Sequence, residues 1–276
     1  MKHIPLGLRD YLPNDIEQRD LLIQKMVDVV QQQEYRRIIT PSIEHYDQLQ
    51  PALGALSDHC IMFFDRSGSR LILRPDHTTP IARIATSRLV EEMPVKLFYH
   101  DPVFRKDPLL GETEIFQFGV EHIGDLSLSD EINMIKMLHD ICKKVGLKDA
   151  EVHVAHPELF SDLSSEELDN LRLGDFKGLA KLPAIGDQTD LPQSSYLTAF
   201  MSGLLDAGIS NVKVNRGLCK DLSFYNGVYF DIVSPSYGKV IGSGGRYDSV
   251  LSAFGSSANA FGFAIRLHYL ERALND

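Results

Sequence analysis

Polar and charged side chains interrupt four stretches of this sequence that otherwise have the apolar character of strands. The stretches are LRPDHTT (73–79), FRKD (104–107), IFQFGVE (115–121) and GGRYD (244–248). Burying side chains such as Asp76, Arg105 and Glu121 without partners would cost several kcal/mol. These side chains therefore either pair with one another in a structural network, the commoner role for any single one of them, or line a cavity for a charged small molecule.

The third stretch favours the cavity. Gln117, Gly119 and Glu121 share one face of a strand, because side chains alternate between the two faces. A glycine between two polar side chains leaves room beside them. This spacing favours a bound ligand over a packed salt bridge.

Two other patterns have a simpler interpretation. The run Gly-Ser-Gly-Gly (242–245) lacks the glycine spacing and the Gly-Lys-Ser/Thr sequence of a phosphate-binding loop, so we interpret it as a turn. His153 and His156 are three residues apart, and on one strand they would point to opposite faces, so both rings could reach one ion only if the strand ends between them. No cysteine or carboxylate pattern completes a zinc site around them, so we expect a structural role and no bound metal.

The elements that must position these residues follow from periodicity and from helix and turn signals. We expect helices over 14–34, from Asp130 to Val145, over 194–207 and from about 260, with short helices in 157–190. We expect strands over 36–40, 71–74, 96–100, 115–123, 151–155, 211–215, 224–233 and 238–242. Ser129, Asp130 and Glu131 favour the start of the second helix, and Gly146 its end. Strands joined by short turns, with helices between clusters of strands, predict an α+β fold with a mainly antiparallel sheet, and a doubly wound parallel sheet is the weaker alternative.

Composition limits the class of protein. The chain has 276 residues and a formal net charge of −10, which does not suit a protein coating nucleic acid. No apolar run is long enough for a membrane helix, and the N-terminus lacks a signal-peptide core. Three widely spaced cysteines do not suggest a disulfide framework. We therefore expect a soluble, cytoplasmic protein.

Seven segments, in order along the chain, resemble the catalytic domain of class II aminoacyl-tRNA synthetases, specifically the histidyl-tRNA synthetase family. They are LGLRDYLP (6–13), EYRRIITPSIE (34–44), LRPDHTTPIAR (73–83), PVFRKDPLLGETEIFQFGVEHIG (102–124), FYNGVYFDI (224–232), GSGGRYDSVL (242–251) and AFGFAIRL (260–267). The resemblance covers nearly the whole chain and implies an antiparallel sheet flanked by helices, with a dimer formed around Pro41. It implies one synthetase-like domain over 1–276 with a small helical insertion around 157–207 and no anticodon-binding domain.

The resemblance also implies a histidine pocket. Its candidate residues are Asp76, Thr78, Arg105, Gln117, Glu121 and Tyr225. In the family an acidic residue at the position of Asp76 meets the ammonium group of the amino acid, and a carboxylate at the position of Glu121 lies beside the imidazole. The chemistry agrees, because an ammonium group needs an anion and an imidazole N–H needs an acceptor.

At the positions where the family binds ATP, this sequence departs from the family pattern. Lys220 stands where the family has its histidine-specific arginine, and lysine lacks the planar fork of a guanidinium. Tyr269 stands where a phosphate-binding arginine is expected, although a shifted register would offer Arg272. We therefore expect no catalytic residues and no cofactor.

These departures are similar to those of the ATP phosphoribosyltransferase regulatory subunits of this family. The resemblance then implies a short-form catalytic subunit as partner in a hetero-octamer, activity in the first step of histidine biosynthesis, and feedback by L-histidine. A minimal histidine-activating enzyme that uses Arg105, Lys220 and Arg272 is the alternative from the enzyme class. A module that senses tRNA is a third, which the acidic charge disfavours.

Overall fold

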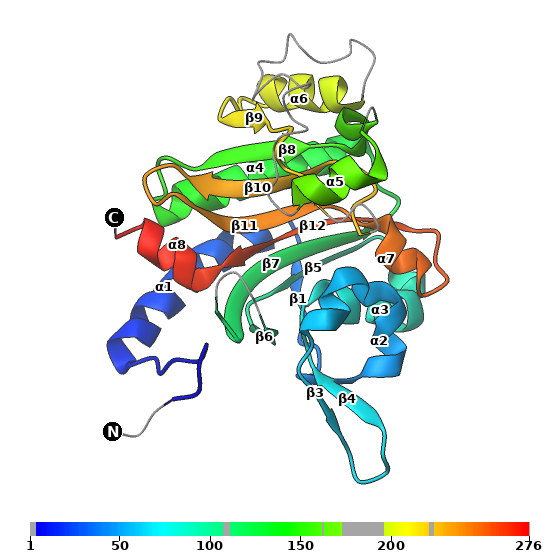
Figure 1. Cartoon of the computed structure of the whole chain (residues 1–276). Coiled ribbons are helices and arrows are strands. Elements are labelled where there is room, and N and C mark those ends of the chain that lie inside the picture. The colour runs from blue at the N-terminus through cyan, green and yellow to red at the C-terminus, as the bar shows by residue number, and fades with distance from the viewer. Residues whose placement is uncertain (1–3, 107–110, 162, 173–195, 221–223, 276) are drawn as a thin grey trace.

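A computed structural model of the protein describes residues 4–106, 111–161, 163–172, 196–220 and 224–275. Within these residues a nine-stranded sheet runs in the order β1-β5-β7-β12-β11-β10-β8-β9, with β6 paired to β7 (Figure 1). Its strands are β1 (Arg36–Arg37), β5 (Val95–Tyr99), β6 (Pro102–Phe104), β7 (Glu114–Gly124), β8 (Glu151–Ala155), β9 (Val212–Val214), β10 (Tyr229–Ser234), β11 (Lys239–Arg246) and β12 (Asn259–Arg266). A smaller three-stranded sheet contains β2 (Ile43–His45), β4 (Arg70–Leu73) and β3 (Met62–Phe64) in that order.

The large sheet is mainly antiparallel, as predicted. Only the short pairs β1–β5 and β8–β9 are parallel among the pairings of the described strands. The central strands β7 and β12 pair over eight positions, which set Glu121 opposite Gly262 and Gln117 opposite Arg266. This register determines which side chains lie beside one another on each face of the sheet.

The two faces of the sheet carry different chemistry. Helices α1 (Pro13–Gln31) and α4 (Leu128–Val145) pack against one face, where Phe118 and Val120 of β7 are fully buried in the main hydrophobic core. Gln117 and Glu121 alternate with these residues and point to the other face, as the period of two predicts. Helices α2 (Tyr46–Leu53), α3 (Thr78–Arg88) and α7 (Asp248–Ser252) form a second core at one end of that other face.

The residues at the two ends of helix α4 explain where the helix begins and ends. The Ser127 side chain accepts a hydrogen bond from the backbone N–H of Asp130, so the cap lies two residues before the predicted Ser129. Gly146 ends the helix in the left-handed conformation, as predicted, because this conformation is unstrained only for glycine.

The C-terminal region contradicts two predictions. The helix expected from about 260 begins only at Leu267 as α8 (Leu267–Ala273), because residues 259–266 form strand β12 between β7 and β11. The glycine run 242–245 is part of strand β11 and is not a turn. A Cβ at Gly244 would lie 2.4 Å from the carbonyl oxygen of Gly262, so close strand packing explains this glycine.

Other predicted boundaries also shift. The strand expected over 36–40 is limited to Arg36–Arg37, and the one expected over 224–233 begins at Tyr229. In the predicted insertion the structure contains α5 (Ser165–Arg172) and α6 (Tyr196–Asp206), while 173–195 lie outside the described residues. No helix in the described part of the chain is both long and apolar enough to cross a membrane.

Candidate functional site

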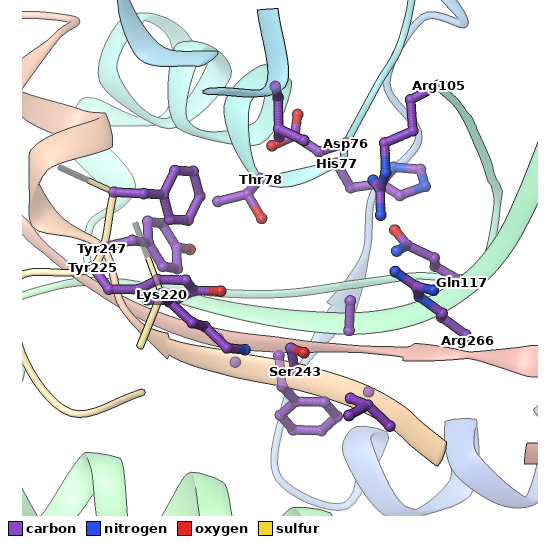
Figure 2. Close-up of a pocket in the computed structure, with 18 of the residues that line it drawn as sticks. Asp76, His77, Thr78, Arg105, Gln117, Lys220, Tyr225, Ser243, Tyr247 and Arg266 are labelled. Carbon is purple, nitrogen blue, oxygen red and sulfur yellow. The ribbon is translucent and has the colours of Figure 1, made fainter. Parts of the chain in front are cut away.

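A cavity of about 760 Å³ lies on the face of the large sheet opposite α1 and α4. Its walls come from the start of α3, from β7, β11 and β12, from the segment around Lys220, and from α8 (Figure 2). The structure brings all of the sequence-derived candidates to this cavity: Asp76, Thr78, Arg105, Gln117, Glu121 and Tyr225. Their role in binding histidine stays a prediction.

Glu121 is the most deeply buried acid of the cavity, with 1% of its surface exposed. Its carboxyl group accepts hydrogen bonds from Thr78 Oγ1 at 2.9 Å, Tyr247 Oη at 2.5 Å and Tyr99 Oη at 3.4 Å. Burial raises the pKa of Glu121 to about 8, although these hydroxyl groups partly oppose the rise. At neutral pH this end of the cavity is therefore uncharged and rich in groups that both donate and accept hydrogen bonds.

Two glycines make this arrangement possible. A Cβ at Gly262 would lie 2.0 Å from Glu121 Oε2, and a Cβ at Gly119 would lie 2.3 Å from Tyr99 Oη. The space beside Gly119 is thus filled by the Tyr99 side chain, and the sequence-based expectation that this glycine leaves room for a ligand is wrong. Gly119 instead lets a tyrosine hydroxyl reach the buried acid.

Asp76 presents an open acceptor at another part of the wall. One carboxylate oxygen accepts from Thr79 Oγ1 at 2.9 Å, and the other, Oδ1, is buried with no hydrogen-bond partner among the described residues. Burial raises the pKa of Asp76. A buried carboxylate oxygen without a donor is costly, so this atom points to a ligand that donates hydrogen bonds.

The neighbours of Asp76 are held firmly. Arg105 donates to the carbonyl oxygen of Pro75 at 2.7 Å. The His77 ring stacks on Tyr99 with 4.0 Å between centroids, and its Nε2 lies 2.9 Å from the carbonyl oxygen of Asp101. Burial lowers the pKa of His77 to about 3, so its ring is neutral and acts in packing.

Lys220 reaches the cavity floor, but its charge is already paired. Its ammonium lies 2.5 Å from Asp231 Oδ1, which also accepts from Ser243 Oγ at 2.7 Å. The same ammonium lies 5.5 Å from the centre of the Tyr225 ring. The Lys220 ammonium is therefore held at the sheet by Asp231.

The C-terminal helix shows which of its residues, Tyr269 or Arg272, lies at the cavity. Tyr269 lines the cavity, whereas Arg272 is exposed and is not part of the cavity wall. The alternative in which Arg272 replaces the missing arginine is therefore wrong. Arg266 lines the cavity instead, and sequence reasoning missed it.

Sequence reasoning also missed Tyr99, Tyr247 and Lys239 in the wall. A signal for Arg266 exists in the alternation of Ala260, Gly262 and Ala264 with larger apolar residues, because a strand with this period places residue 266 on the same face. His153 and His156 lie elsewhere, within 3.1 Å and 3.6 Å of glutamate oxygens. The described residues contain no group of histidine, cysteine and acidic side chains suited to a metal ion.

Comparison with known proteins extends these findings. The family model described as histidyl-tRNA synthetase matches residues 7–172 and 187–270. The ATP phosphoribosyltransferase regulatory subunit of Geobacillus thermodenitrificans is 30% identical, over 99% of this chain and 80% of that protein. The protein of the same name from Carboxydothermus hydrogenoformans is 28% identical, over 99% of this chain and 97% of its own length. A crystal structure described as an ATP phosphoribosyltransferase regulatory subunit/histidyl-tRNA synthetase from Bacillus halodurans superposes with a TM-score of 0.85 at 28% identity, covering 100% of this chain and 84% of that one.

Proposed function

The chain belongs to the histidyl-tRNA synthetase family, among the ATP phosphoribosyltransferase regulatory subunits with the class II synthetase-like fold, and from this premise we propose that it regulates a phosphoribosyltransferase. Its partner is a short-form ATP phosphoribosyltransferase catalytic subunit, which it activates and makes sensitive to L-histidine. The complex is a cytoplasmic hetero-octamer that joins ATP to phosphoribosyl pyrophosphate in the first step of histidine biosynthesis.

The observation that carries this proposal is the unpartnered Oδ1 of Asp76 in a cavity that also contains Arg105. A free amino acid carries an ammonium and a carboxylate, and these two side chains offer the opposite charges. Glu121 and its tyrosine and threonine neighbours supply hydrogen-bond partners for an imidazole ring. A ligand that lacks the ring nitrogens would leave these buried groups unpaired, so the site favours histidine.

The proposal assigns no catalytic step to this chain. Lys220 is paired with Asp231, and Tyr269, which lines the cavity, stands where the family resemblance implies a phosphate-binding arginine. Histidine bound in the cavity changes the packing of the chain against its partner and so shifts the balance between active and inhibited complexes. A coupling free energy of about 1–3 kcal/mol is enough for such regulation.

The test mixes the purified full chain with the short catalytic subunit and measures phosphoribosyl transfer and co-elution on size exclusion. We expect one complex with higher activity than the catalytic subunit alone. The control is the same mixture made with heat-unfolded chain. Absence of both activation and co-elution would overturn the proposal.

One observation favours a second function, a minimal histidine-activating enzyme. Arg266 places a second guanidinium beside Gln117, in the same cavity as Arg105. Histidine-dependent exchange of pyrophosphate into ATP by the isolated chain would support this activity, and the regulatory proposal expects none.

A further inference from the structure

Glu131 is a buried acid that does not line the cavity. It lies in the first turn of α4, and none of its surface is exposed. One carboxyl oxygen accepts a hydrogen bond from Tyr196 Oη at 2.7 Å, and the other accepts from Arg246 Nη1 at 3.0 Å. Tyr196 begins helix α6 and Arg246 ends strand β11. Glu131 therefore joins the helical insertion to the large sheet.

Arg246 and Tyr247 are neighbours in the chain but serve opposite sides of the sheet. Arg246 is directly opposite Phe261, which is buried in the main hydrophobic core on the side of α4. Tyr247 lines the cavity, where its hydroxyl group donates to Glu121 at 2.5 Å. Consecutive residues of an extended chain point to opposite faces. A group that holds Arg246 on the helix side therefore also sets the place of Tyr247 on the cavity side.

The segment that precedes β10 also lies close to Arg246. A Cβ at Gly227 would lie 2.7 Å from the Cδ atom of Arg246, so the arginine side chain passes directly across this segment. The backbone N–H of Asn226 donates to the carbonyl oxygen of Arg246 at 3.2 Å. Tyr225 belongs to the same segment, and its side chain lies at the same end of the cavity as that of Tyr247 (Figure 2). Arg246 thus fixes two tyrosines of the cavity wall.

A second carboxyl group holds the Arg246 guanidinium from the other side. Arg246 Nε donates to Asp248 Oδ2 at 2.8 Å, and the other oxygen of Asp248 accepts from the backbone N–H of Ala260 in β12 at 2.8 Å. Hydrogen bonds between charged groups are about twice as strong as neutral ones. Weakening the bond to Glu131 therefore loosens Arg246 without releasing it from the sheet.

Helix α6 is packed firmly enough to carry Tyr196 with it. A Cβ at Gly203 would lie 2.3 Å from the Cδ1 atom of Ile132, so α6 and α4 are in close contact. Leu197 and Phe200 of α6 are fully buried in the main core. In Figure 1 α6 lies beyond β8, far from α3, whose first residue lines the cavity. The hydrogen bond from Tyr196 therefore links a distant helix to the residues behind the cavity wall.

We propose that Glu131 and Arg246 are positioning residues of the ligand cavity. They fix Tyr247 and Tyr225 from the far side of the sheet, and Tyr196 makes the docking of α6 part of the same arrangement. A molecule that shifts α6 then changes the affinity of the cavity, and a ligand in the cavity changes the docking of α6 by the same factor. The effect on histidine rests on the proposed function, whereas the link between α6 and Tyr247 is a property of the isolated chain.

A double-mutant cycle in the isolated full chain tests this link without a ligand. Glu131→Gln keeps an acceptor for Arg246 but removes its charge, and Tyr247→Phe removes the hydroxyl group that donates to Glu121. Without a link, the effects of the two substitutions on the unfolding equilibrium constant multiply. We expect the double variant to depart from this product by about threefold or more. Tyr99→Phe is the matched control, since Tyr99 Oη lies 3.4 Å from the same Glu121 but on β5, and its effect should multiply with that of Glu131→Gln.

Calorimetry with L-histidine as the probe measures the consequence for the cavity. We expect the dissociation constant to rise about threefold or more in Glu131→Gln and in the milder variant Tyr196→Phe. Tyr35→Phe is the matched control, because it removes a buried tyrosine hydroxyl group that lies 3.8 Å from Met134 Sδ on the same helix α4. Its affinity for histidine should equal that of the wild type.

Two results would overturn the positioning pair. The first is a cycle in which the effects of Glu131→Gln and Tyr247→Phe simply multiply. The second is an unchanged affinity for histidine in both Glu131→Gln and Tyr196→Phe. A wild-type chain that does not bind histidine would contradict the proposed function instead, and the cycle alone then supports or overturns the positioning pair.

Discussion

Replacing Glu121 by glutamine should give a protein whose stability advantage over the wild type grows as the pH rises. The pKa of this buried carboxyl group is about 8 in the folded protein against an ordinary value of 4.5, because burial disfavours the charged form. Between these two values the unfolded chain has released the proton while the folded chain still holds it. The free energy of unfolding of the wild type therefore falls with rising pH in this window, and that of Glu121→Gln has no such contribution.

The size of the effect follows from the two pKa values. At about 1.36 kcal/mol for each pKa step, the gap between 4.5 and about 8 corresponds to roughly 5 kcal/mol once the pH exceeds both values. Glutamine keeps one acceptor and gains a donor, and the hydroxyl groups of Thr78 and Tyr247 can reorient to match it. The cost in hydrogen bonding is therefore small beside the electrostatic gain.

Urea unfolding at pH 5, 6, 7, 8 and 8.5 measures this difference directly. We expect the stability of Glu121→Gln relative to wild type to increase by several kcal/mol from pH 5 to pH 8. Burial also raises the pKa of Glu131, which both proteins share, so its contribution cancels. The Asp76 carboxylate helps to raise the pKa of Glu121, so its influence is part of the effect that is measured. Glu17→Gln, at an exposed site on α1, is the control and should show no trend. A difference that stays constant with pH, or decreases, would refute the reasoning.

Three further substitutions test the packing. Gly119→Ala should destabilise the protein by about 1–3 kcal/mol in urea unfolding, because its Cβ would lie 2.3 Å from a tyrosine hydroxyl, and an unchanged midpoint would contradict this close contact. Tyr196→Phe should cost about 1–3 kcal/mol in thermal unfolding, because it removes a 2.7 Å hydrogen bond to the buried Glu131, and no loss would mean that this bond is not formed. Ser127→Ala should cost about 1 kcal/mol and Ser129→Ala much less, and equal losses would contradict the assigned helix cap.

Local sequence patterns predicted much of the fold. The apolar stripe of α4 and the glycine after it, and the alternation in β7, are signals within one element, and both elements form where expected. Strand β12 was predicted wrongly as part of a helix. Its extended form comes from pairing with β7 and β11. The helix-forming residues that follow the strand led to a predicted helix start that was too early in the sequence.

The candidate site was predicted in part, for a similar reason. The polar residues of 73–79 and 115–121 interrupt apolar stretches and so could be found along the chain. Tyr99 was missed because it reaches Glu121 only through the pairing of β5 with β7. Arg266 was missed because its place beside Gln117 depends on a register that the sequence does not display.

The most direct test of the account is the response of the reconstituted complex to L-histidine when Asp76 is replaced by asparagine. The measurement is phosphoribosyl transfer against histidine concentration for the two complexes. If the cavity is the regulatory amino-acid site, the Asp76→Asn complex stays active while its inhibition midpoint rises about tenfold or more, since the ammonium group loses its charged partner. An unchanged midpoint in a fully active complex would contradict the account.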